Sequence, residues 1–348
     1  MASSMNIVSL LILISSFIIL DVVHGFSAAN YGIDSDFLSQ KIDSNRTIIV
    51  DLNGEGDFKS IQAAIDSVPE GNSEWVTIHV NKGIYREKVH IPRNKPYIFM
   101  KGDGKGKTVI TWSEKSDHYY KYKSATFIAE APDLIAFGIS FKNDAPKGGI
   151  GIDSSSSKNQ SVAALVGADK IAFYQCAFFS TYNTLFDYKG RHYYDNCYIQ
   201  GSIDFIFGRG QSFFQNCEIF VNGDRRAEIK GSVTAHSRRS GGENSGFVFI
   251  NGRIYGVGDA FLGRPHGAFS RVVFANTYLS KSIVPRGWTN WSHNGTTDQL
   301  YHAEYKCHGP GAVPRDRAHW SKQLDDKEAE PFLSIDYING KHWLPAYM

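Results

Sequence analysis

The sequence predicts an all-β protein: a single-stranded parallel β-helix with a helix capping its N-terminal end. Three observations predict it. A motif recurs about every 20 residues in the middle of the chain, aromatic and β-branched residues alternate with polar ones inside each unit, and one amphipathic helical segment precedes the strands. Units this short cannot be pairs of helices, so each is expected to contribute one turn of stacked strands.

The repeat is clearest around three of the four cysteines. Each unit reads aromatic, any residue, Asn or Gln, a small residue or Cys, any residue, apolar. The units are FYQCAF (173–178), YDNCYI (194–199), FQNCEI (214–219), FINGRI (249–254) and FANTYL (274–279). Stacked in register at about 4.8 Å, they would form ladders of like residues. The alternative is a β-sandwich in which the similarity of these segments is accidental.

Strand-like, glycine-punctuated stretches continue the pattern upstream. They are VTIHV (76–80), KVHI (88–91), YIFMKG (97–102) and LIAFGISF (134–141). Residues 61–68 carry apolar side chains at i, i+3, i+4 and i+7, and Pro69 ends this run. The resulting helix is expected to cover the open strand edges at the N-terminal end of the coil.

The chain is expected to divide into three segments. Residues 1–25 are expected to be a signal peptide, because an apolar run at 7–20 is short and is followed by small residues. A buried helix or a membrane anchor is the alternative. Residues 26–47 are expected to be a flexible leader and 48–348 one β-helix domain, in which the part from about residue 283 forms loops folded back over the stack.

Composition narrows the possible functions. A net charge of +2 argues against nucleic-acid binding. The cysteines form no CxxC pair, which argues against a zinc site, and an oxidising compartment would permit a disulfide without choosing its partners. No metal or other cofactor is expected. If the chain is secreted, four sequons are candidate sites of N-glycosylation: those at Asn45, Asn159, Asn290 and Asn294.

One carboxylate lies in an unexpected place. Asp204 falls within the apolar run of GSIDFIFG (201–208), where an uncompensated buried charge would cost several kcal/mol. It follows the segment 181–185 by about one rung, and that segment follows Gln160 by about one rung. These residues are therefore expected to share one face, on a groove that suits a linear polysaccharide.

These residues resemble the plant pectin methylesterases (pectinesterases), carbohydrate esterases with a right-handed parallel β-helix. The likeness covers roughly residues 47–344. The stretches that carry it are GIYREK (83–88), NQSVAALVGADKIAFYQC (159–176), GRHYYDNCYIQGSIDFIFG (190–208) and FLGRPHG (261–267). The resemblance implies a secreted cell-wall enzyme that hydrolyses the methyl esters of homogalacturonan. It also implies a monomer with a proteinaceous pectinesterase inhibitor as a candidate partner.

The resemblance also implies roles for single residues. Asp204 matches the aspartate that attacks the ester carbonyl, and Arg264 matches the arginine that orients this nucleophile and compensates its charge. Gln160 matches the first of two glutamines that stabilise the oxyanion. The alternatives are that Asp204 is a buried structural aspartate, that Gln160 is an amide of a side-chain ladder, and that Arg264 is a solvated surface cation.

Three positions depart from the family pattern. Counted from Cys176 without a gap, the second oxyanion glutamine becomes Tyr182 and the acid/base aspartate becomes Asn183. Asparagine has no proton to give at neutral pH, whereas a general acid contributes about 10²- to 10⁴-fold. The tryptophan on which a sugar stacks becomes His266, a smaller platform.

Three functions compete. The first is an esterase, whose turnover the change to Asn183 reduces. The second is a homologue without catalysis that binds pectin or an inhibitor. The third is another β-helix enzyme, a polysaccharide lyase or a glycosidase. The third ranks last because the sequence shows neither a carboxylate cluster for calcium nor a carboxylate pair flanking a glycosidic bond.

Overall fold

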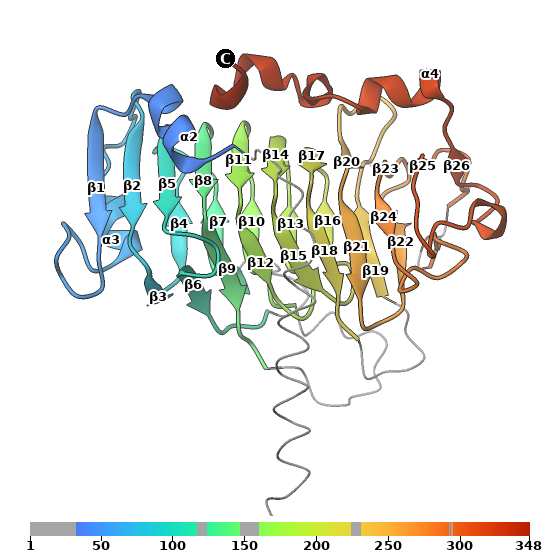
Figure 1. The fold of residues 1–348 in the computed structure, drawn as a ribbon, viewed down its shortest axis with the longest axis horizontal. Helices are drawn as coiled ribbons and strands as arrows, with labels where there is room; N and C mark the ends of the chain where they lie inside the picture. The colour runs from blue at the N-terminus through green and yellow to red at the C-terminus, as the bar shows by residue number, and fades with distance from the viewer. Residues whose placement is uncertain (1–32, 117–123, 147–159, 224–230, 292, 294) are drawn as a thin grey trace, which may run out of the picture. The chain divides into compact units, whose positions relative to one another are not determined.

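Three parallel sheets, here called A, B and C, wind around one core, and the chain visits them in turn (Figure 1). The computed structural model describes residues 33–116, 124–146, 160–223, 231–291, 293 and 295–348, of which 34–348 form one unit. Every strand pair within the sheets is parallel, which confirms the predicted parallel β-helix. The expected signal peptide lies outside the described residues.

Sheet A has 11 strands. They are β1 (Arg46–Val50), β2 (Val76–Val80), β5 (Ile98–Gly102), β8 (Leu134–Phe137), β11 (Ile171–Tyr174), β14 (Arg191–Asp195), β17 (Gln211–Gln215), β20 (Gly246–Ile250), β23 (Arg271–Ala275), β25 (Tyr301–Tyr305) and β26 (Lys322–Gln323). The predicted strand at 76–80 is β2, and that at 97–102 contains β5.

Sheet B has eight strands and sheet C has seven. Sheet B consists of β3 (Gly83–Arg86), β6 (Thr108–Trp112), β9 (Ile139–Asn143), β12 (Ala177–Phe179), β15 (Tyr198–Gly201), β18 (Glu218–Val221), β21 (Arg253–Gly256) and β24 (Tyr278–Leu279). Sheet C consists of β4 (Val89–Ile91), β7 (Phe127–Ala129), β10 (Ala164–Val166), β13 (Leu185–Asp187), β16 (Ile206–Gly208), β19 (Gly231–His236) and β22 (Ala260–Pro265).

The repeated aromatic position forms a stacked ladder inside the coil. The register of sheet A aligns Phe173, Tyr194, Phe214, Phe249 and Phe274. Their ring centroids are 5.3, 4.4, 4.3 and 4.5 Å apart in that order, with nearly parallel planes. The predicted ladder is therefore present, and it anchors the register of the rungs.

The recurrent Asn or Gln turns the chain from sheet A to sheet B. Five such residues have left-handed backbone conformations: Gln175, Asn196, Asn216, Asn251 and Asn276, with φ between 48° and 56°. Asparagine tolerates this conformation better than most residues, which explains why the motif favours it at this corner.

The cysteines that follow the corner residues are inward-facing thiols. Cys176, Cys197 and Cys217 are buried, Cys307 is partly buried, and none of the four is paired. Their Sγ atoms contact backbone carbonyls, as Cys197 does with Phe173 at 3.4 Å. Burial raises the pKa of the Cys307 thiol to about 12. In this structure the cysteine ladder is core packing.

The N-terminal end is closed by α3 (Ile61–Asp66), as predicted. Ile61, Ala64 and Ile65 are buried against the first strands. The Glu87 carboxylate accepts hydrogen bonds from the Ser60 hydroxyl (2.7 Å) and from the backbone amides of Ile61 (2.8 Å) and residue 62 (3.0 Å). A negative charge at a helix N-terminus stabilises the first turn.

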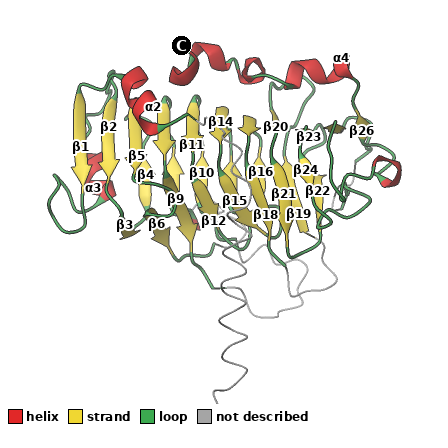
Figure 2. Cartoon of the chain, viewed as in Figure 1, coloured by secondary structure: helices red, strands yellow, loops and turns green. Residues whose placement is uncertain are grey.

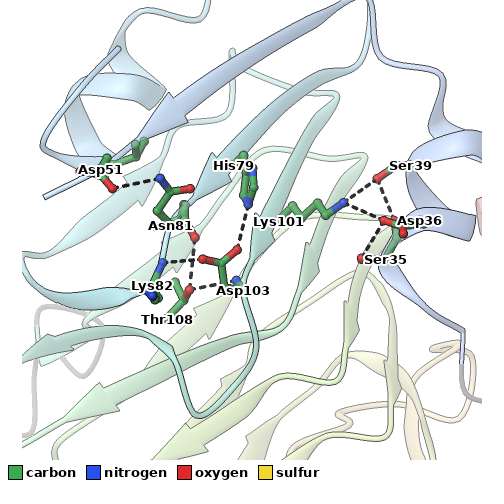
Figure 3. Close-up of polar contacts among 12 residues, drawn as sticks. Ser35, Asp36, Ser39, Asp51, His79, Asn81, Lys82, Lys101, Asp103 and Thr108 are labelled. Carbon is green, nitrogen blue, oxygen red and sulfur yellow. Dashed lines mark hydrogen bonds and ion pairs between the residues drawn. The ribbon is translucent and has the colours of Figure 1, made fainter. Parts of the chain in front are cut away.

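The predicted flexible leader over 26–47 needs correction in its described part. Residues Ser35–Ile42 form the helix α2, capped by the Asp34 side chain, and β1 begins at Arg46. Lys101 of β5 contacts the Asp36 carboxylate at 3.2 Å, which ties α2 to sheet A (Figure 3). The helix forms because Leu38 and Ile42 are buried on it, a signal too short to stand out in the sequence.

The C-terminal segment folds back along the stack, as expected, but it is not all loop. It contributes β25 and β26 to sheet A before α4 (Asp326–Ala329). Short 3₁₀ helices then run back toward α2 (Figures 1 and 2). These are η4 (Glu330–Phe332), η5 (Ile335–Ile338), η6 (Gly340–His342) and η7 (Pro345–Tyr347), while η3 (Pro314–Asp316) precedes α4. The Tyr347 and Tyr193 hydroxyls are 3.0 Å apart.

Within the described part of the chain, no helix has the length and apolar character needed to cross a membrane.

Candidate active site

The corner between sheets B and C carries the candidate residues. The register of sheet C aligns Ala164 with Leu185 and Leu185 with Ile206. The segments that enter these strands, 160–163, 181–184 and 202–205, therefore lie on three consecutive rungs, about 4.8 Å apart. This is the side-by-side arrangement expected from spacing alone.

Hydrogen bonds to both its backbone and its carboxylate fix the position of Asp204. Its backbone is left-handed (φ 47°), and its amide donates to the Ser232 carbonyl at 2.8 Å. Arg264 Nε donates to both carboxylate oxygens at 2.9 and 3.0 Å, and Arg264 Nη2 donates to Oδ2 at 2.5 Å. The Ser232 hydroxyl donates to Oδ1 at 2.5 Å.

This ion pair explains how a carboxylate is tolerated in an apolar run. Asp204 is 8% exposed and Arg264 is 9% exposed, so both charges are largely removed from water. A planar guanidinium that contacts both oxygens compensates the charge and fixes the plane of the carboxylate. The Asp204 carboxylate is thereby held in one orientation, which is what a carboxylate nucleophile requires.

Asn183 lies one rung before Asp204. Tyr182 pairs with Ile203 across the rungs, and the Asn183 amide donates to the Ile203 carbonyl at 3.3 Å. Asn183 also has a left-handed backbone (φ 57°), and its Nδ2 donates to the Asp204 carbonyl oxygen at 3.4 Å. The alignment without a gap thus agrees with the register, and the group beside Asp204 is an amide.

Gln160 lies on the rung before Tyr182. Its carbonyl accepts from the Ser116 amide at 3.0 Å, and the next amide, that of Ser161, donates to the Tyr182 carbonyl at 3.3 Å. The Gln160 Oε1 atom is buried and has no hydrogen-bond partner among the residues that the structure describes. Buried polar atoms are rarely left unpaired, except where a ligand or water completes the site.

The outer face of sheet C provides an apolar floor beside these groups. Its register aligns Leu165, Phe186, Phe207, Ala235 and Arg264 in one column. The rings of Phe186 and Phe207 stack with centroids 4.5 Å apart. Leu165, Phe207 and Ala235 are buried, and Phe186 is partly exposed, so Phe186 is the ring of this column that a sugar could contact.

His266 follows Arg264 by two residues, just beyond the end of β22, and its side chain is exposed. It belongs to the same face as Arg264 but lies farther along the strand direction than Asp204.

Two residues of this site were not predicted. Ser232 faces Asp204 from β19, but 28 residues separate the two, so the 20-residue period fails to align them. Trp291 lies with its ring centroid 5.0 Å from the Arg264 guanidinium and is 59% exposed. Its sequence signal was only its place in the Trp-rich C-terminal part, and only the fold brings it to Arg264.

Among the residues described, no group of three or more His, Cys, Asp or Glu side chains has the arrangement of a metal site. Of the expected sequons, Asn45 and Asn290 are exposed, whereas Asn159 and Asn294 lie outside the described residues.

Comparisons with known proteins show the family of this chain. The pectinesterase family model matches residues 47–341. The chain is 59% identical over 315 residues to "Probable pectinesterase 67" of Arabidopsis thaliana, covering 90% of each chain, and 41% identical to "Probable pectinesterase 29", covering 85% of this chain and 88% of the relative. The solved pectin methylesterase from carrot superposes with a TM-score of 0.80 at 32% identity, covering 87% of this chain and 96% of the carrot chain. The chain therefore belongs to the pectinesterase family of carboxylic ester hydrolases.

Proposed function

We propose that this chain hydrolyses methyl esters of galacturonate in cell-wall pectin, with Asp204 as the nucleophile. The observation that carries the proposal is the fixed carboxylate: Asp204 is bound by Arg264 and Ser232 at one end of an apolar floor. One carboxylate oxygen attacks the ester carbonyl carbon, and the electron pair of the C=O bond moves to oxygen to give a tetrahedral oxyanion.

We infer that two side chains stabilise this oxyanion. The Gln160 amide and the Tyr182 hydroxyl lie on the two rungs before Asp204. The Gln160 side-chain amide carries Nε2–H groups that can donate to an oxyanion, and the Tyr182 hydroxyl can donate as well. A donor aimed at a developing oxyanion contributes about 3 kcal/mol.

Collapse of the oxyanion breaks the bond to the methoxy group, which leaves as methanol after gaining a proton. Asn183 cannot supply that proton, so it comes from the Tyr182 hydroxyl or from solvent water. The product is a mixed anhydride between Asp204 and the galacturonate. Water then attacks the galacturonate carbonyl and the bond to the Asp204 oxygen breaks, giving a free uronate and restoring the Asp204 carboxylate. Of the two protons of this water, one replaces the proton given to methanol and the other passes to solvent.

Methanol release from methylated pectin tests the proposal. The mature chain should release methanol, and Asp204→Ala should not. Asp133→Ala is a matched control, because Asp133 also has a left-handed backbone (φ 53°) and an ion pair, with Lys170 at 3.3 Å. Equal release by the native chain and by Asp204→Ala would overturn the assignment of the nucleophile.

A second candidate function is favoured by the amide at 183: a homologue that binds pectin or a proteinaceous inhibitor without turnover. In that case the native chain would bind pectin fragments without releasing methanol. The double variant Tyr182→Gln/Asn183→Asp would then create activity. Measurable turnover by the native chain would eliminate this candidate.

We also propose that the protein is secreted to the cell wall and acts as a monomer. The apolar run at residues 7–20 and membership of the pectinesterase family support secretion. Recovery of the chain in the apoplastic fluid, with residues 1–25 absent from its N-terminus, would test this proposal. Light scattering of the purified chain would test the monomer.

A further inference from the structure

A charged cluster lies inside the coil rather than on its outer face. Asp187, the last residue of β13 in sheet C, and His192 of β14 in sheet A face each other there, and both side chains are fully buried. Ser212 of β17 is the neighbour of His192 in the register and is also fully buried. The proposed mechanism uses none of these groups, yet a buried charge is costly unless its partners are well placed.

Asp187 accepts hydrogen bonds on both carboxylate oxygens. Its Oδ1 accepts from the Ser212 hydroxyl at 2.8 Å and lies 3.0 Å from His192 Nδ1. Its Oδ2 accepts from the Tyr194 hydroxyl at 2.8 Å. Gly210 leaves the space for this carboxylate, because a Cβ atom there would lie 1.8 Å from Asp187 Oδ1. An ionised carboxylate only accepts hydrogen bonds, so the arrangement suits the charged form of Asp187.

Both ring nitrogens of His192 face oxygen atoms that accept hydrogen bonds. Nδ1 is 3.0 Å from Asp187 Oδ1, and Nε2 is 2.8 Å from the Ala168 carbonyl oxygen. A neutral imidazole carries one N–H, so one of these contacts would bring two lone pairs together. The Ser212 hydroxyl is 3.4 Å from Nδ1 but 2.8 Å from Asp187, to which it donates. With Asp187 ionised, only the imidazolium, which has an N–H on each nitrogen, satisfies both contacts.

The surroundings of His192 favour its positive charge. Burial alone would lower the pKa of His192, but the charge and hydrogen bond of Asp187, together with the Ala168 carbonyl, raise this pKa above its ordinary value. The side chains that surround the ring from its own and the adjoining elements are Asp187 on β13, Tyr194 on β14, Asp169 bound by Arg191 at the preceding corner, and the uncharged Ile171 and Ser212 on β11 and β17.

Two other buried histidines have the opposite arrangement. His236 Nδ1 accepts a hydrogen bond from the Arg271 amide at 3.1 Å, and His302 Nε2 is 2.8 Å from the Ser270 hydroxyl. Burial lowers the pKa of each of these histidines to about 3, so both are neutral at neutral pH. His192 differs from them because a carboxylate faces its ring.

We propose that His192 is an imidazolium inside the coil and that its proton is a pH-sensitive lock between sheets A and C. The pair with Asp187 joins β14 to β13, which begins two residues after Asn183. When the pH rises, His192 releases one proton to solvent and leaves the Asp187 carboxylate buried without a cation. Removing one partner of a buried ion pair is strongly destabilising, so this proton sets an alkaline limit to the folded coil.

The stability that this proton provides should be lost at alkaline pH. A histidine whose pKa is raised by folding stabilises the fold fully below its unfolded value of about 6.5, and the effect is lost as pH rises through the folded pKa. In that interval the ratio of folded to unfolded chains should fall by up to about tenfold per pH unit. His236 and His302 contribute no change there, because their pKa values are lowered.

Nitrogen-15 NMR of the histidine-labelled mature chain tests the charge state directly. At pH 7 the His192 ring should show two N–H groups and the His302 ring one. Nuclear Overhauser contacts of the ring protons with Ser212 and Tyr194 identify the His192 signals in the native chain, so this test needs no variant. A single N–H on the His192 ring of the folded chain at pH 7 would overturn the proposal.

Urea unfolding between pH 6 and pH 10 tests the lock. The ratio of folded to unfolded chains should fall more steeply for the native chain than for His192→Gln, which has no proton to lose. His302→Gln is the matched control, because His302 is also buried in sheet A but faces a hydroxyl, and this variant should keep the native fall. The same pH dependence in the native chain and His192→Gln would overturn the lock, as would its loss in His302→Gln.

An NMR titration of the native chain keeps the lock testable if His192→Gln does not fold. The second N–H of His192 should disappear over the same pH interval in which the native chain loses stability. Loss of this N–H with no change in stability over that interval would overturn the lock.

Discussion

Restoring a carboxyl group at position 183 should raise the rate of ester hydrolysis. Asn183 and aspartate have nearly the same shape, and both tolerate the left-handed backbone seen there (φ 57°). The Asn183 side-chain amide donates a long hydrogen bond, 3.4 Å, to the Asp204 carbonyl oxygen. Asn183→Asp therefore exchanges an amide for a carboxyl group without needing a new backbone path.

The charges of Asp204 and Arg264 affect the pKa of the carboxyl group introduced at position 183. At the rung spacing of about 4.8 Å and an effective dielectric constant of about 20, repulsion from Asp204 is about 3 kcal/mol. Arg264, bound to Asp204, offsets part of it, so a smaller net repulsion remains. This repulsion raises the pKa of the introduced carboxyl group, which keeps a share of it protonated in mildly acidic conditions.

A protonated carboxyl group can give its proton to the departing methoxy group. General acids contribute about 10²- to 10⁴-fold, so kcat for methanol release should rise at least about 100-fold over the native chain. KM should change little, because the substitution adds no sugar contact. The rate is measured by methanol release from methylated pectin between pH 4.5 and 8, and the gain should shrink at high pH as the carboxyl group ionises.

Asn251→Asp is the control. Asn251 has the same backbone conformation (φ 56°) at an exposed corner between sheets A and B, far along the chain from Asp204. The control should leave the rate unchanged. A native rate in Asn183→Asp, with the fold intact by circular dichroism, would refute the assignment of position 183 to proton transfer.

Three further predictions concern stability. Burial raises the pKa of Asp195 to about 6, so the folded state holds this proton more tightly than the unfolded chain does. The free energy of unfolding should therefore fall as pH rises from about 4 to about 6. Asp195→Asn should abolish this fall and should be more stable than the native chain at pH 7 by up to about 3 kcal/mol, measured by urea unfolding. Glu87→Ala removes the acceptor at the start of α3 and should lower the free energy of unfolding by about 1–2 kcal/mol; no change would contradict the capping role. Asp187→Asn breaks a fully buried pair with His192 and should cost about 3–5 kcal/mol, seen as a large fall in Tm.

The sequence predicted those parts of the fold that repeat. The aromatic, Asn or Gln, and Cys positions of the five units mark a strand of sheet A, a left-handed corner and an inward side chain in that order, so their spacing gave the rungs. The sequence could not show that the Asp187 side chain lies inside the coil. In a strand pattern, a charged residue on the inner face looks the same as a polar residue on the outer face. It also could not align Ser232 with Asp204, because the longer connection between these rungs breaks the period.

The backbone of the corners gives a physical reason for the amide at position 183. Left-handed corners between sheets A and B are occupied by Asn196, Asn216 and Asn251, so asparagine is a residue that this coil uses for structure. At the corner between sheets B and C the same conformation holds Asn183 and Asp204, and only Asp204 has a guanidinium to compensate a charge. Aspartate at 183 would place a second, unpaired carboxylate on the next rung, at a cost in stability of about 1 kcal/mol or more. Asn183 is thus the more stable choice for the corner and the poorer one for proton transfer. The gain in kcat expected for Asn183→Asp should therefore come with a lower Tm.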